Sequence, residues 1–145
     1  MFALLLSCAA TSQENIGAAF YSELDKLFES LSGESLSGRY TDGIYIKARQ
    51  ARRDGKEWGE HTATDETTSD GAVLVVVLAA LHTEPLELAR AAMALMAPLH
   101  GDTFIKQNAV VFGLAVQALI NGVSFQELGG HVKGMRHSRL ACTSL

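Results

Sequence analysis

The side chains with the greatest capacity for chemistry gather in one polar stretch at 61–70. It holds a histidine, three carboxylates and a run of hydroxyls: His61, Thr62, Thr64, Asp65, Glu66, Thr67, Thr68, Ser69 and Asp70. Such oxygen donors can hold a hard cation, or contact the hydroxyls of a ribose or the oxygens of a phosphate. Their spacing matches no defined metal motif, so a solvated connection that caps the next helix is the simpler interpretation.

His100 is the second candidate, in the turn Leu99-His100-Gly101-Asp102 between two apolar segments. Because imidazole titrates near neutral pH, this side chain could face a pocket or donate to a ligand. The alternative is a turn histidine bonded to a backbone carbonyl, and the sequence alone favours it. A nucleophile elbow, a P-loop and a dinucleotide-binding glycine pattern are all missing from the sequence.

The sequence predicts that the elements which position these side chains are helices. The chain is rich in alanine and leucine and has only 2 prolines, which favours long helices. Apolar residues recur at helical spacing over most of its length. Helices are expected at 2–10, 16–31, 41–51, 71–82, 85–97 and 103–120, with loops at 32–38 and 53–70. The sequence therefore predicts an all-α fold, a compact multi-helix orthogonal bundle.

Several parts of the chain allow more specific predictions. Residues 71–82 are apolar on every face, and their valines also suit a buried strand, but the length favours one central helix. Thr83 and Asp102 or Thr103 are expected to cap the helices that follow them, with Pro85 in a first turn. Ser124 and Glu127 fit a capping box. Glycines follow at once, so residues 129–145 are expected to form an irregular tail after a domain at 1–128.

Charge and cysteine content restrict the class of protein. The net charge is -4 and the pI is about 5.7, which argues against binding to nucleic acid. No unbroken apolar run reaches the roughly 18 residues that cross a bilayer, so no membrane partner is expected. Cys8 and Cys142 form no zinc pattern, and their scarcity suggests a reducing, cytoplasmic compartment. The oligomeric state stays open.

The order of features from His61 to Leu128 resembles the ADP-ribosylglycohydrolase family, most closely its J1-crystallin-like branch. In that family an Asn- or Asp-Gly-Ala segment opens a buried helix, which Asp70-Gly71-Ala72 matches. A Thr-x-His or Thr-Gln-Asn turn precedes a later helix, which Leu99-His100-Gly101-Asp102 matches with a hydrophobic residue before the histidine. The stretch at 38–53 resembles the family's Gly-x-Tyr-Asp loop and the helix after it.

The resemblance implies an ADP-ribosylglycohydrolase-type bundle, apparently incomplete. It implies that Thr67, Thr68, Asp70 and Gly71 line a cleft for ADP-ribose or an ADP-ribosylated substrate, with His100 nearby. Family enzymes hold two Mg²⁺ ions with a Thr-Asp-Asp and a Gly-Gly-Asp-x-Asp motif. Both motifs are missing from this sequence, so no metal ligand can be carried over.

Two functions follow from the resemblance. Intact relatives hydrolyse the N- or O-glycosidic bond of ADP-ribose adducts with Mg²⁺, and this chain is expected to be an inactive relative because it lacks both acidic motifs. The alternative is a non-catalytic, crystallin-like structural or ligand-binding protein. A helical interaction module whose partner covers the apolar faces is a third, unrelated possibility.

Overall fold

The computed structural model describes residues 1–11, 15–30, 43–59, 62–65 and 70–138. Its elements, in chain order, are α1 (Phe2–Thr11), α2 (Ile16–Ser30), α3 (Gly43–Arg53), the 3₁₀ helix η2 (Asp70–Leu74), α4 (Val75–Leu81), α5 (Pro85–Met96), α6 (Thr103–Ile120) and α7 (Leu128–Ser138). Every regular element in these ranges is helical, which confirms the all-α prediction. The expected loop at 32–38 and the first two residues of the helix expected at 41–51 lie outside the described residues.

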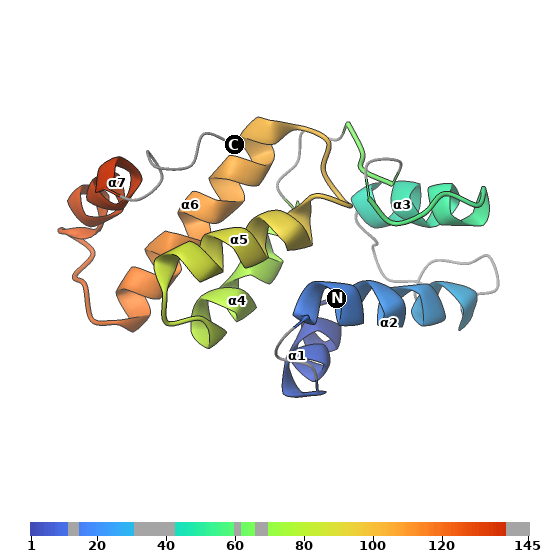
Figure 1. Cartoon of the computed structure of the whole chain (residues 1–145), viewed down its shortest axis with the longest axis horizontal. Helices are drawn as coiled ribbons and strands as arrows, with labels where there is room; N and C mark the ends of the chain where they lie inside the picture. Colours follow the sequence, from blue (N-terminus) through green and yellow to red (C-terminus); the bar gives the residue numbers. More distant parts are fainter. Residues whose placement is uncertain (12–14, 31–42, 60–61, 66–69, 139–145) are drawn as a thin grey trace.

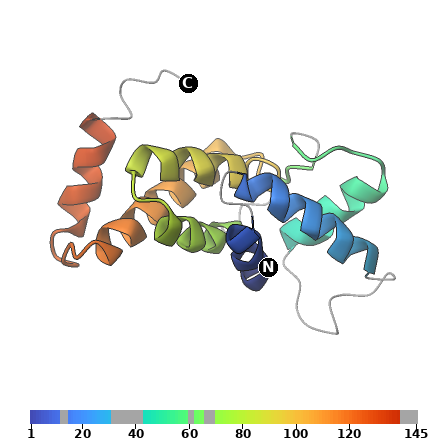
Figure 2. The same cartoon turned by 60° about the horizontal axis from the view of Figure 1, so that its bottom comes forward.

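The helices form two groups that meet where α1 contacts η2 and α4 and where α2 contacts α5. In the first, α1 packs on α2, and α3 lies beside α2 at one end of the molecule. In the second, α5 and α6 pack against each other over most of their lengths, and α4 lies against both (Figure 1). Helix α7 packs on α6, at the opposite end of the molecule from α3 (Figure 2). The arrangement is elongated, with the chain crossing from one group to the other after residue 59.

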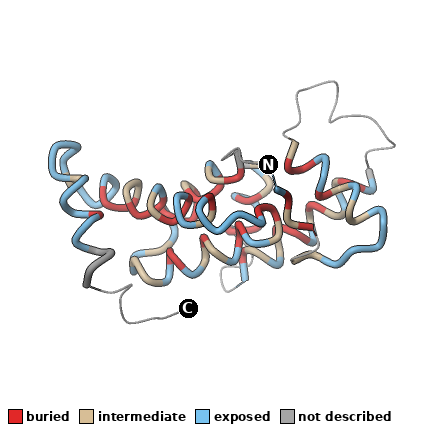
Figure 3. The backbone as a smooth tube through the Cα atoms, turned by 90° about the horizontal axis from the view of Figure 1, so that it is seen from above, coloured by how far each residue is buried: buried red, intermediate tan, exposed pale blue. Residues whose placement is uncertain are grey.

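A single apolar core runs through both groups. It extends from Leu5 in α1 to Leu114 in α6, and the buried positions lie where helices face one another (Figure 3). The largest fully buried side chains include Phe20, Leu78 and Leu95. Because this core spans the junction, removal of one large side chain at the junction is expected to loosen both groups.

Local signals set two of the helix starts. The Asp102 carboxylate accepts a hydrogen bond from the Phe104 amide at 2.6 Å and caps α6, as predicted. Pro85 is the first residue of α5, where its missing N–H costs nothing. The residue before it, Glu84, occupies the N-cap position, and its side chain makes no capping hydrogen bond, so the prediction of Thr83 as the cap is wrong.

The apolar segment at 71–82 is helical, which excludes the strand alternative, but it is not one continuous α-helix. Its first turn is the 3₁₀ helix η2, and α4 begins only at Val75. Gly71 and Val73 are weak helix formers, and 3₁₀ turns are frequent at helix starts. The tighter turn places Gly71 against the chain segment around His100.

The prediction of an irregular tail from residue 129 is wrong as far as Ser138. Helix α7 continues through Gly129, Gly130 and Gly134, and its Val132 is buried. Packing on α6 therefore offsets the low helix propensity of glycine. The Ser124 hydroxyl donates to the Glu127 carboxylate at 2.6 Å in the turn before α7, rather than at its cap. Residues 139–145 lie outside the described part.

Helix α6 alone has the length and composition of a membrane span among the described residues. It contains 18 residues with a mean hydropathy of 1.4. The sequence showed no unbroken apolar run there because Lys106, Gln107 and Asn108 interrupt it. In the fold, α6 packs against α5 and α4 and contributes buried residues to the core, as the central helix of a bundle does.

Candidate functional site

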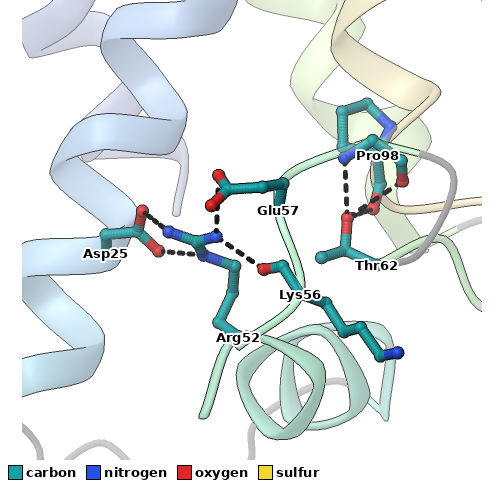
Figure 4. A network of polar contacts seen from close by, with 7 residues as sticks. Asp25, Arg52, Lys56, Glu57, Thr62 and Pro98 are labelled. Atoms are coloured by element: carbon teal, nitrogen blue, oxygen red, sulfur yellow. Dashed lines mark hydrogen bonds and ion pairs between the residues drawn. The ribbon is translucent and has the colours of Figure 1, made fainter. Parts of the chain in front are cut away.

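The polar segment at 62–65 lies along the turn that contains His100. Thr64 and His100 form an isolated parallel bridge. The Thr64 amide donates to the Leu99 carbonyl at 3.0 Å, and the Gly101 amide donates to the Thr64 carbonyl at 2.9 Å. The Thr62 hydroxyl donates to the Pro98 carbonyl at 2.9 Å (Figure 4). Two segments that the sequence treated as separate candidates are therefore hydrogen-bonded to each other.

Gly71 brings the start of η2 to the same place. A Cβ atom on Gly71 would lie 2.8 Å from Nε2 of His100 and 3.3 Å from Cδ1 of Ile44. Both His100 and Ile44 are fully buried. Only glycine fits this position without displacing the imidazole, so α3, η2 and the turn at 99–102 converge on His100.

Three of the predicted site residues are described at least in part. Gly71 and His100 lie in contact, Asp70 is the first residue of η2, and Thr67 and Thr68 lie outside the described residues. His61 and Glu66 also lie outside them. His100 is fully buried rather than open to solvent, and it lies where α3, η2 and the turn at 99–102 meet.

The surroundings of Asp65 do not indicate a metal site. Its exposed carboxylate is paired with Nζ of Lys47 at 3.2 Å, and this hydrogen bond lowers the pKa of Asp65. Within the described ranges, no three histidine, cysteine, aspartate or glutamate side chains gather closely enough to hold an ion. The donor set there does not fit the Mg²⁺ ions of the family.

A cavity that sequence reasoning missed lies between α2 and α5. Its volume is about 580 Å³. Its wall combines apolar side chains of α2 and α5 with Trp58 from the turn after α3, His82 from the end of α4, and Arg52. The signal in the sequence was the only tryptophan, set among charged residues, but nothing local showed which helices it would join.

Arg52 ties α3 to α2 at the rim of this cavity. Its Nε and Nη2 donate to the two carboxylate oxygens of Asp25 at 2.9 and 2.8 Å, and its Nη1 donates to the Lys56 carbonyl at 2.6 Å (Figure 4). The guanidinium carbon lies 5.5 Å from the centre of the Trp58 ring. The hydrogen bond with Asp25 raises the pKa of Arg52, so the guanidinium stays charged.

Replacement of Arg52 with methionine is expected to lower the free energy of unfolding by about 1.5–3 kcal/mol, because a two-bond contact with a charged partner is lost. Urea unfolding of R52M, D25N and the double variant measures the coupling between the two side chains. The double variant should cost less than the sum of the single ones. Additive effects would show that the ion pair contributes nothing.

Aromatic contacts complete the wall. The Trp58 and Tyr21 ring centres lie 4.6 Å apart, and the Tyr21 hydroxyl donates to the Leu95 carbonyl of α5. Burial raises the pKa of Tyr21 well above its usual range, so its hydroxyl remains a donor at neutral pH. The tyrosine thus links α2, α5 and the tryptophan.

Comparison of the chain with protein-family models, with curated proteins and with solved structures gave no match.

Proposed function

We propose that this chain is a non-hydrolytic helical protein of the ADP-ribosylglycohydrolase type, which binds a ligand of the ADP-ribose class beside Gly71 and His100. The observation that supports the proposal is the contact between these two residues. They belong to the two segments that carry the resemblance, Asp70-Gly71-Ala72 and the turn at 99–102. A shared ligand site requires such segments to lie together.

The chemistry of the neighbouring side chains suits a sugar. Thr67, Thr68 and Asp70 lie within the four residues before Gly71 in the chain. Hydroxyls donate and accept hydrogen bonds, and a carboxylate accepts them, so these groups match the hydroxyls of a ribose. The buried His100 and the bridge at Thr64 fix the two ends of this polar segment. We assign to His100 a positioning role rather than a catalytic one.

Hydrolysis is not part of the proposal. Cleavage at the anomeric carbon in the family depends on metal-held water. The sequence lacks both acidic motifs that would hold the ions, and the carboxylate of Asp65, which precedes this segment, is paired with Lys47. A release assay with an ADP-ribosylated substrate and Mg²⁺ is expected to show no turnover, and clear turnover would refute this part.

Calorimetric titration of ADP-ribose tests the binding itself. The native chain is expected to bind equally with and without Mg²⁺. Gly71→Ala should weaken binding by about tenfold or more, because the added methyl displaces His100. Gly130→Ala is the matched control, since a Cβ there meets nothing within 4 Å.

The outcomes separate the alternatives. A native chain that releases no heat with ADP-ribose, while folded by circular dichroism, would favour the crystallin-like structural protein. If Gly71→Ala and the native chain bind ADP-ribose with equal affinity, the ligand does not bind beside Gly71 and His100. Binding of ADP-ribose that requires Mg²⁺ would contradict the proposal that the site works without a metal ion.

A further inference from the structure

We propose that the cavity between α2 and α5 is a second binding site, for an uncharged, planar heteroaromatic molecule of one or two rings. This site is separate from the one beside Gly71 and His100, and the inference does not rest on the proposed function. It rests on the size of the cavity, the bonds that hold it open, two buried polar atoms in its lining residues, and its charge.

The cavity is far larger than a packing defect. It opens to solvent, since Ser22 and Ala94 of its lining are exposed, and its volume is about 580 Å³. Ligand pockets for small molecules occupy about 300–1,000 Å³. Small side chains leave the space on both helices: Gly17 and Ala18 on α2, and Ala91 and Ala94 on α5. A Cβ atom on Gly17 would meet nothing within 4 Å.

Polar bonds hold the walls in place. Tyr21 bonds to the carbonyl of Leu95 and fixes α2 to α5. Arg52 and Asp25 fix α3 to α2 (Figure 4). Because these directional bonds join the helices around the cavity, it can exist without collapse before a ligand arrives. Such preformed sites are typical of small-molecule pockets.

Two lining residues carry buried nitrogen atoms without a hydrogen-bond partner, Nε1 of Trp58 and Nε2 of His82. Both atoms are covered in this structure, and a ligand in the cavity would bond to them after a rotation of each ring. The buried indole N–H of Trp58 is unfavourable without an acceptor, and a heteroaromatic ring nitrogen or carbonyl would supply one. Arg52 and Tyr21 already lie against the indole ring, which leaves the indole edge for hydrogen bonding.

The charges of the rim favour a neutral molecule. Asp25 and Glu57 line the cavity with one cation, Arg52, and Arg52 already bonds to both carboxylates and to a backbone carbonyl. The remaining negative charge opposes an anionic ligand. The apolar walls contributed by Leu78, Leu95 and Pro98 accept a flat ring.

An isosteric pair of probes tests the proposal, quinoline-3-carboxamide and the anionic quinoline-3-carboxylate. Trp58 is the only tryptophan, so its indole N–H gives one signal in a ¹H–¹⁵N spectrum of the whole chain. The carboxamide is expected to shift this signal saturably, and the carboxylate is expected to bind about tenfold more weakly. No saturable shift, or a preference for the carboxylate, would overturn the proposal.

Variants locate the binding. Ala94 is exposed and lines the cavity, so Ala94→Phe should fill the space and abolish the carboxamide shift. Ala94→Leu should weaken binding to a smaller degree. Ala97→Phe is the matched control, because Ala97 is exposed at the end of α5 and lies outside the cavity lining. Unchanged binding in Ala94→Phe would overturn the assignment. Retained binding in Gly71→Ala separates this site from the ADP-ribose site.

Discussion

Replacement of Phe20 with alanine is expected to lower the free energy of unfolding by about 3–5 kcal/mol. Phe20 is fully buried in α2, and its ring lies 5.3 Å from that of Tyr21, edge to face. It belongs to the core that joins the two groups of helices. Alanine would remove the apolar contacts and leave a void that helices held by polar bonds cannot fully close.

Urea unfolding followed by circular dichroism measures this loss, with Phe125→Ala as the control. Phe125 is 79% exposed, so its replacement should change stability by less than about 0.5 kcal/mol. A loss below about 1 kcal/mol in Phe20→Ala would contradict the core that the structure shows. Two separate unfolding transitions in the variant would show that Phe20 couples the two groups of helices.

Gly113→Ala is expected to destabilise the chain by about 1–3 kcal/mol through overpacking. A Cβ atom on Gly113 would lie 2.4 Å from Cγ1 of Val75, and Val75 is fully buried. The new methyl group would push α6 away from α4, two helices at the centre of the bundle. This cost exceeds the gain of about 1 kcal/mol that alanine offers over glycine inside a helix.

Gly130→Ala provides the matched comparison, because that position in α7 has open space around it. It is expected to stabilise the chain by about 0.5–1 kcal/mol. Thermal unfolding of both variants measures whether each replacement lowers or raises the stability of the chain. Val75→Ala combined with Gly113→Ala should recover part of the loss, since the clashing methyl is removed. A Gly113→Ala variant as stable as the native chain would show that α4 and α6 do not approach so closely.

The sequence by itself determined that the segments as far as α6 are helical and where several helices begin. The apolar period of α2, the Asp102 cap and Pro85 at the start of α5 act within a few residues of the chain. Their energies do not depend on distant partners. Periodicity also placed the polar stretch before η2 and the turn after α5, which are the two parts of the proposed ADP-ribose site.

Only the tertiary structure decided what these segments meet. The contact of His100 with Gly71, the stacking of Arg52 on Trp58 and the cavity beside them join residues from different helices. Helix α7 persists through its glycines because it packs on α6. Local propensities differ by about 1 kcal/mol per residue. Burial of a single large side chain exceeds that, so contacts between helices override the local signal.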